Sequence, residues 1–139
     1  MVFSSERMTI STQGECDVVD ITAEVQKRVE AFGKRRGLAT IFVAGATAGI
    51  TTLEYEPGLV EDLKQAVERL LPSGTEYEHD KRWRDANGHS HLRAALLGPS
   101  LVVPIAEGRL TLGTWQQIVV VDFDNRARTR AVHVHLMGE

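Results

Sequence analysis

The apolar residues of this 139-residue chain follow two different periods, and the period changes several times along the sequence. Apolar residues recur at helical spacing in residues 21–37 and 56–74, which predicts two long helices. Alternating or nearly continuous apolar residues, many of them β-branched, predict strands at residues 1–12, 38–45 and 49–55. The first half of the chain is therefore expected to mix strands with helices.

The ends of these elements are marked by helix-breaking residues. We expect the first helix to end at Gly37 and the second to end at Pro72, followed by Gly74. Residues 38–45 are almost entirely apolar, so this strand is expected to be covered on both faces.

The second half reads mainly as antiparallel strands. Residues 91–98 predict a helix of about two turns, with Ser90 as its N-cap and Gly98 as its stop. Residues 100–139 then predict three or four strands. We therefore predict a single α+β domain over residues 1–139, with a β-rich antiparallel or mixed sheet or sandwich flanked by two longer helices and one short helix.

Composition narrows the classes of function. With 42% hydrophobic residues the chain is long enough for one core, and its net charge of −3 gives no general electrostatic reason to bind nucleic acid or an acidic membrane. The lone Cys16 cannot form an internal disulfide, the first residues lack the apolar core of a signal peptide, and no segment reaches the length of a membrane span. A cytoplasmic protein is expected.

Three of the five histidines, His79, His89 and His91, lie in one polar stretch. If the backbone is extended up to Ser90, the rings of His89 and His91 point the same way, and the region of Gly88 can bring His79 back as a third ligand. Three imidazoles suit zinc or a related divalent ion with one open position. The alternative is that these are surface histidines in a polar loop.

Two alternating patterns near the C-terminus have simpler interpretations. His133 and His135 alternate with apolar residues, so they are expected to face solvent from a strand and not to bind the metal. Arg126, Arg128 and Arg130 alternate in the same way. They form either a basic stripe for phosphate or a solvated strand end or subunit salt bridge.

Two segments of small or irregular character are further site candidates. Residues 45–49 are small and include Thr47, so a ligand could approach the backbone closely, or the segment could simply be a packed crossing. Residues 113–116 interrupt a strand pattern and include Trp115, whose commoner fate is the core. Glu54 lies among apolar residues, where burial would raise its pKa toward that of a general acid or base, unless it faces solvent beside the Pro57 turn.

Two motifs carry a resemblance that covers nearly the whole chain. The run NGHSHL at residues 87–92 and the run GRLTLGTWQ at residues 108–116 resemble the YjbQ-like family, also called the secondary thiamine-phosphate synthase family. The resemblance implies a compact α+β homotrimer with polar residues in clefts near subunit boundaries and a weak thiamine-phosphate-forming activity.

Residues are carried over only where the sequence matches. The family commonly has His-Thr-Thr-Ala-Ala at residues 45–49, where this chain keeps only the threonine Thr47, and Leu53 replaces an asparagine that precedes Glu54. The family's remaining polar positions match, and they are His79, Asn87, His89, His91, Thr114, Trp115 and Gln116.

Two classes of function follow from the resemblance. As an enzyme, the protein would join a pyrimidine pyrophosphate to a thiazole phosphate, with a metal on His79, His89 and His91 stabilising the leaving pyrophosphate. The catalytic residues would be Glu54, Asn87 and His91, and Thr47, Thr114 and Gln116 would bind the ligand. The alternative is a non-catalytic trimer that holds a metal and a small phosphorylated metabolite, with Asp85 or Asn87 orienting the metal ligands.

Overall fold

The computed structural model describes the whole chain, Met1 to Glu139, as eight strands and four helices. The strands form two antiparallel sheets, one of five strands in the order β1-β8-β3-β5-β6 and one of three in the order β2-β7-β4. The predicted α+β class is confirmed. The elements are β1 (Val2–Thr12), β2 (Asp17–Asp20), α1 (Thr22–Phe32), β3 (Gly37–Val43), β4 (Ala48–Leu53), α2 (Pro57–Leu70), α3 (Glu78–Trp83), α4 (Gly88–Leu97), β5 (Ser100–Ala106), β6 (Arg109–Leu110), β7 (Gln117–Asp122) and β8 (Arg128–Gly138).

Strand β7 lies between two apolar clusters and contributes to both. Ile118 and Val120 belong to the larger cluster of 16 buried residues, which fills the space between the five-stranded sheet, β7 and α1. Val119 and Val121 belong to a smaller cluster beneath α2 and α4. Both faces of β7 are buried, which explains its continuous apolar sequence.

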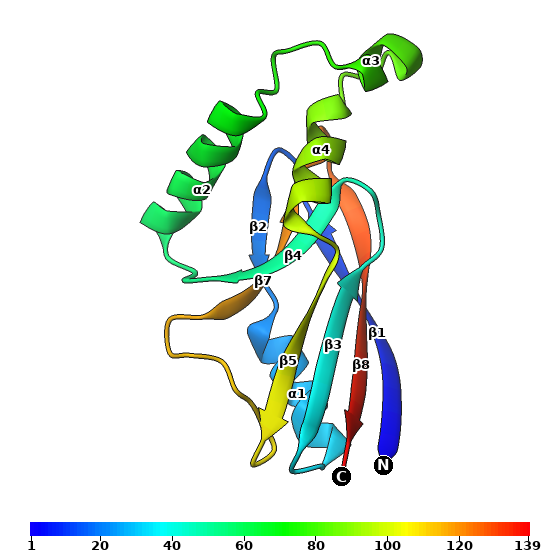
Figure 1. Ribbon diagram of the computed structural model, residues 1–139, viewed down its shortest axis with the longest axis vertical. Coiled ribbons are helices and arrows are strands. Elements are labelled where there is room, and N and C mark those ends of the chain that lie inside the picture. The colour runs from blue at the N-terminus through cyan, green and yellow to red at the C-terminus, as the bar shows by residue number, and fades with distance from the viewer.

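Strand β3 does not have the two covered faces that its sequence suggested. Its residues alternate between buried and accessible, and Leu38 and Phe42 are 38% and 41% exposed. The outer face of the five-stranded sheet carries no helix, because α1 packs against the inner face (Figure 1). The apolar composition of β3 therefore led to a wrong prediction, because one face of this strand is not covered.

The first long helix ends earlier than expected, whereas α2 ends at Leu70, just before the predicted stop at Pro72. Helix α1 ends at Phe32, because Gly33 takes the left-handed conformation with φ of 69° and closes the last turn. Gly37 instead begins β3. Helix α2 begins after Glu56, whose carboxylate accepts hydrogen bonds from the backbone N–H groups of Gly58 and Leu59, both at 2.8 Å.

The polar stretch after α2 contains a short helix, α3, that periodicity did not predict. Helix α4 begins at Gly88, before the expected Ser90 or His91. Helices α2, α3 and α4 gather at one end of the molecule, and the two chain ends lie at the other (Figure 1). None of the helices is long and apolar enough to cross a membrane.

Candidate metal and ligand site

Asp80 fixes the corner between α3 and α4. Its Oδ2 atom accepts a hydrogen bond from the backbone N–H of Tyr77 at 3.0 Å, and its Oδ1 atom accepts one from the N–H of Gly88 at 2.8 Å. A Cβ atom at Gly88 would lie 2.7 Å from the Cβ of Tyr77, so only glycine allows this approach. The sequence from Tyr77 to Gly88 thus closes into a loop that holds its side chains against the start of α4.

This corner brings His79 and His91 together. Their ring centroids lie 4.3 Å apart, and Nδ1 of His79 lies 3.4 Å from Oδ1 of Asp85 and 3.7 Å from Oδ1 of Asp80. Nδ1 of His79 is buried and has no hydrogen-bond partner. His79, Asp80 and Asp85 each offer a ligand atom within 4.8 Å of the others, which is a donor set that suits a divalent cation.

The ring of His91 is kept in its neutral form. Burial lowers its pKa, and the neighbouring ring of His79 lowers it further. A neutral imidazole is the form that binds a metal ion, so this environment favours coordination.

His89 does not join this pair. The backbone is helical from Gly88, so His89 and His91 project roughly 200° apart around α4. His89 is only 4% exposed, its Nε2 lies 3.4 Å from Oγ of Ser90, and its Nδ1 has no partner. The expectation of an extended backbone up to Ser90 was wrong, and with it falls the geometric reason for His89 as a ligand.

Asn87 and Thr47 belong to a buried polar network centred on Asp124. Oδ2 of Asp124 accepts hydrogen bonds from the hydroxyl of Thr47 at 2.8 Å and from Nδ2 of Asn87 at 3.3 Å. Oδ1 of Asn87 accepts from the backbone N–H of Asn125 at 3.2 Å. Asn87 therefore connects the start of α4 to the turn after β7. The side chains of Asn87 and Thr47 both form hydrogen bonds within the fold.

A second carboxylate, Asp122, anchors the same network to β8. Nε and Nη2 of Arg130 donate to the two oxygens of Asp122 at 2.7 and 2.8 Å, and Nη2 also donates to Thr47 at 2.6 Å. Burial raises the pKa of Asp122, but hydrogen bonds from Arg130 and Thr12 outweigh this effect and hold the pKa below its usual value. Arg130 is only 7% exposed, so the interpretation of the arginine stripe as a solvated strand end is wrong at this residue.

Glu54, Thr114 and Gln116 lie elsewhere in the chain's fold. Glu54 and Thr114 line a hollow of about 400 Å³ together with Trp115, which is 74% exposed and not part of the core. Nε2 of Gln116 donates to the hydroxyl of Thr52 at 3.1 Å, and its Oε1 accepts from the N–H of Gly113 at 3.0 Å. Glu54 faces solvent beside the Pro57 turn, which is the second of the two interpretations of its sequence position.

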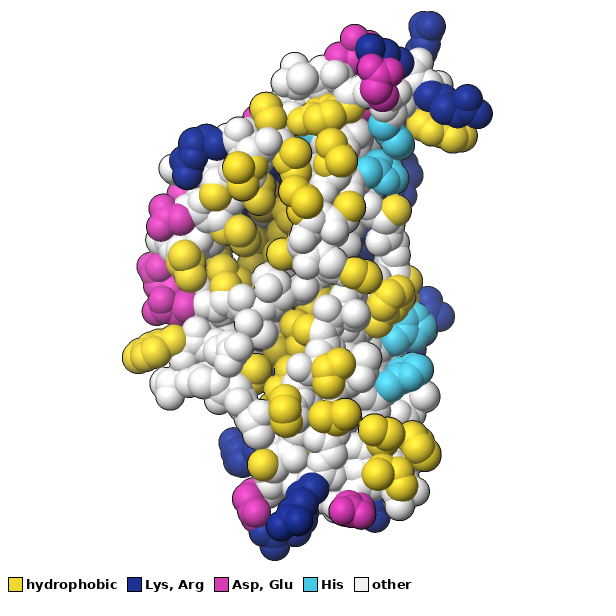
Figure 2. All heavy atoms as spheres, in the orientation of Figure 1, with side chains coloured by type: hydrophobic (Ala, Val, Ile, Leu, Met, Phe, Trp, Pro, Cys, Tyr) yellow, Lys and Arg dark blue, Asp and Glu magenta, His cyan; other side chains and the backbone are white.

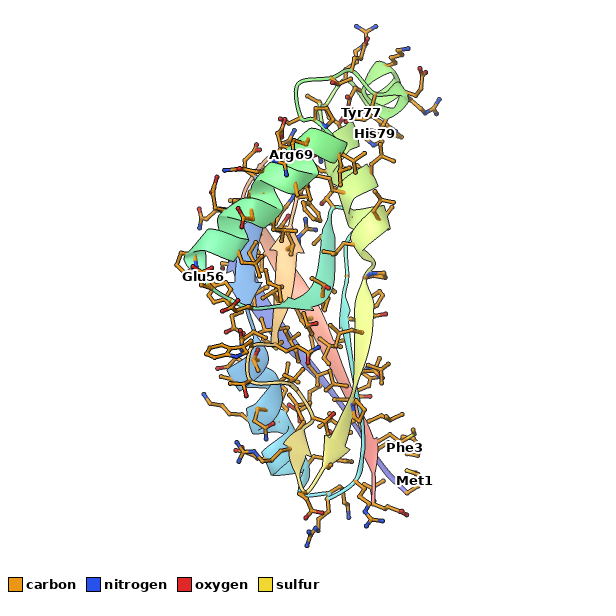
Figure 3. The ribbon with its side chains drawn as sticks, turned by 60° about the vertical axis from the view of Figure 1, so that its left-hand side comes forward. Met1, Phe3, Glu56, Arg69, Tyr77 and His79 are labelled. Carbon is orange, nitrogen blue, oxygen red and sulfur yellow. The ribbon has the colours of Figure 1, made fainter.

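The residues around His91 and Thr47 lie far from Glu54 and Thr114 within one chain. Thr47 and Glu54 flank β4, a six-residue strand, so they are separated by roughly 20 Å at the usual rise per residue. In Figure 3, His79 lies near the top of the molecule, whereas Glu56, which lines the same hollow as Glu54, lies at the far end of α2. One chain therefore holds the two groups of predicted site residues in separate places.

Three aspartates organise the region around His79, Asn87 and Thr47, and none of them is among the site residues predicted from the sequence. They are Asp80, Asp122 and Asp124. A signal did exist, because Asp122 and Asp124 alternate at the end of the long apolar run of β7 and face alternating arginines after one turn. Buried carboxylates of this kind require a buried partner.

Comparison with known proteins gives a consistent result. The model for the UPF0047 protein YjbQ-like family matches residues 6–139. A UPF0047 protein of Archaeoglobus fulgidus is 41% identical over 127 residues, which cover 91% of this chain and 96% of that protein. The UPF0047 protein YugU of Bacillus subtilis is 33% identical, covering 94% and 97% of the two chains.

Solved structures agree in fold over nearly the full length. A YbjQ-like protein of unknown function from Sulfolobus solfataricus superimposes with a TM-score of 0.93 at 36% identity, covering 99% of both chains. A YjbQ/UPF0047 family protein of Clostridium acetobutylicum gives a TM-score of 0.86 at 32% identity, covering 95% of this chain and 99% of that one. The chain belongs to the UPF0047 YjbQ-like family.

Proposed function

We propose that this protein binds a divalent metal ion, with zinc as the expected ion, and uses it to hold a small phosphorylated metabolite. The ligands in this proposal are His79, His91 and Asp85. The observation that carries it is the pairing of two imidazoles beside a carboxylate, with Nδ1 of His79 buried and unpartnered 3.4 Å from Asp85. Two nitrogens and one oxygen leave an open position on zinc for a ligand group.

The phosphate-bearing ligand is inferred from the family resemblance and from the chemistry of a bound metal. A divalent ion with an open position attracts phosphate oxygens and offsets their negative charge. The chain's net charge of −3 gives no general attraction for anions, so the attraction has to come from such a local site.

The transferase interpretation is the second candidate, and the geometry places a condition on it. Glu54 and Thr114 are separated from His91 within one chain, so a site using all three needs residues from two copies. The homotrimer implied by the resemblance would allow this arrangement. The homotrimer is therefore part of this proposal.

The test of the metal site is zinc binding by purified variants. His79→Ala, His91→Ala and Asp85→Asn should each weaken zinc binding by at least roughly tenfold, as measured by calorimetric titration. His89→Gln should retain the affinity of the parent protein, because His89 points away from the pair. His133→Ala combined with His135→Ala serves as a control on exposed histidines and should also retain it.

The pattern of losses separates the alternatives. Parent-like affinity in the first three variants would contradict the site, and a loss in His89→Gln would restore the original three-histidine hypothesis. Because burial lowers the pKa of His91, protons should compete for its ring at a lower pH than they do for an ordinary histidine. Zinc affinity should be weaker at pH 5 than at pH 8, because imidazole ligands bind zinc only in their neutral form.

A further inference from the structure

The guanidinium group of Arg130 is buried but not fully used. Its hydrogen bonds to Asp122 and Thr47 come from Nε and Nη2, and no hydrogen bond joins Nη1 to a protein atom. Some side-chain nitrogens in this protein are completely buried without a hydrogen-bond partner, but Nη1 of Arg130 is not one of them. It follows that Nη1 is not completely buried and that its two N–H donors have no acceptor within the protein.

Nη1 of Arg130 lies against the backbone of Gly45. A Cβ atom at position 45 would lie 2.4 Å from Nη1 and 3.5 Å from Cζ of Arg130. Gly45 also has a φ of 132°, a conformation that L side chains rarely adopt.

The loop around Gly45 adds further donors. Gly45 and Ala46 are exposed, and their backbone N–H groups take no part in the backbone hydrogen bonds of the fold, whereas the preceding N–H of Ala44 donates to Ala131. The loop borders a hollow of about 350 Å³ whose wall is otherwise formed by His91, Pro99 and alanines, with no carboxylate. The hollow thus has unpaired backbone N–H donors at its edge and no negatively charged side chain in its wall, which an oxyanion site requires.

The charge behind this site is balanced rather than negative. Asp122 and Asp124 are both buried, and they are paired with Arg130 and with Arg128, whose Nη2 lies 3.1 Å from Asp124. The nearest contact of Arg130 to Asp124 runs from Nη2, at 3.8 Å, and not from Nη1. The outward N–H groups of Nη1 remain directed away from these carboxylates toward Gly45.

We propose that Nη1 of Arg130 and the backbone N–H groups of Gly45 and Ala46 form an oxyanion site for the phosphate group of the metabolite, beside His91. The site extends the proposed function by naming where the phosphate sits. It does not depend on the metal, because none of its three donors is a proposed metal ligand.

The test uses inorganic phosphate and the metal-free protein, followed by the amide signals of Gly45 and Ala46 in heteronuclear NMR spectra. Phosphate should shift both signals in a saturable way. Ala46→Glu places a carboxylate at the site and should weaken phosphate binding by roughly tenfold or more, whereas the neutral, isosteric Ala46→Gln should bind within about twofold of the parent protein. Equal affinity in these two variants would overturn the proposal.

A second pair of variants tests the arginine directly. Gly45→Ala should abolish the phosphate response, because the added Cβ covers or displaces Nη1. Gly108→Ala is the matched control, since Gly108 also has a positive φ, of 76°, but its Cβ would meet nothing closer than 4.0 Å. A phosphate response that survives Gly45→Ala, or a tighter response to acetate than to phosphate, would also overturn the assignment.

One variant separates this proposal from the metal site. His79→Ala should lose zinc and keep phosphate binding in metal-free buffer. If zinc binding fails in the parent protein while phosphate binds at Gly45, the proposed metal site is wrong and the oxyanion site stands.

Discussion

His89 is a buried ionisable side chain that affects the stability of the folded protein. It is 4% exposed in α4, and its Nδ1 atom has no hydrogen-bond partner. Burial lowers its pKa, and the positive charge of Arg93 lowers it further. Charging this ring would bury an uncompensated cation, so the folded protein holds it neutral.

The pH dependence of stability follows from that shift. The unfolded chain takes up a proton on His89 at a higher pH than the folded protein does, so stability is fully present above about 6.5 and decreases as pH falls through the lowered folded-state pKa. Urea unfolding should give a lower free energy of unfolding at pH 5.5 than at pH 7.5. His89→Gln should reduce this difference.

A control separates His89 from the other histidines. His135→Gln removes an exposed histidine on β8, outside α4, so its difference between the two pH values should stay closer to that of the parent protein than the difference in His89→Gln does. An unchanged difference in His89→Gln would show that another group controls the acid response.

At the scale of elements, apolar periodicity correctly predicted the helices and strands that bury one face. It did not predict the elements whose position is set by polar contacts. The strands and both long helices follow their apolar spacing. Helix α3 has no apolar stripe, because it is organised by Asp80 accepting from Tyr77 and Gly88. Sequence spacing cannot show such contacts, so it also misplaced the start of α4 and grouped His89 with His91.

The candidate site was recoverable only in part for the same reason. His79, His91, Asn87 and Thr47 do lie at one end of the molecule, as their motifs suggested. Glu54, Thr114 and Gln116 were grouped with them through the resemblance, but β4 carries Glu54 away along its length. Matching a motif identifies residues and leaves their distances open.

Helix α2 is held only loosely by the core. Its apolar residues Val60, Leu63 and Val67 only partly cover the smaller cluster, and none of its residues is fully buried. Its first turn depends on the carboxylate of Glu56, whose pKa is lowered by the backbone N–H groups of Gly58 and Leu59. Local stability of α2 therefore depends strongly on one cap.

Replacing this cap should loosen α2 without unfolding the rest. Glu56→Ala should speed amide hydrogen exchange in the first turns of α2 at neutral pH, while β7 keeps its protection. Asp62→Ala, an exposed change inside the same helix, should leave those turns close to the parent rate. Parent-like exchange in Glu56→Ala would mean that packing, and not the cap, holds the helix.

At the scale of the whole molecule, the outer face of the five-stranded sheet is uncovered and partly apolar. Phe3, Leu38, Phe42 and Val102 are each between 38% and 70% exposed there, beside His133 and His135. Figure 2 shows apolar side chains spread over the lower half of this face, next to histidine. A sheet face of this kind is usually covered by a partner, and the proposed trimer supplies one.

A charge placed on that face tests the trimer. The parent protein should sediment as a trimer, and Phe42→Glu should shift it to a monomer with unchanged circular dichroism, because a carboxylate cannot be buried there without a partner. Leu70→Glu alters a side chain that is 75% exposed on α2 and should remain trimeric. A parent protein that is monomeric at micromolar concentration would rule out this arrangement.

The long pairing of β1 with β8 has a practical consequence for handling the protein. The register runs from Val2 opposite Gly138 to Thr12 opposite Arg128, so residues 1 and 139 lie side by side at the end remote from the histidines. A short glycine-rich linker could join them, and new ends could be opened in the exposed segment of residues 73–76 between α2 and α3. Such a circularly permuted chain would carry a fluorescent label or a tether next to the proposed binding residues, where the natural ends cannot place one.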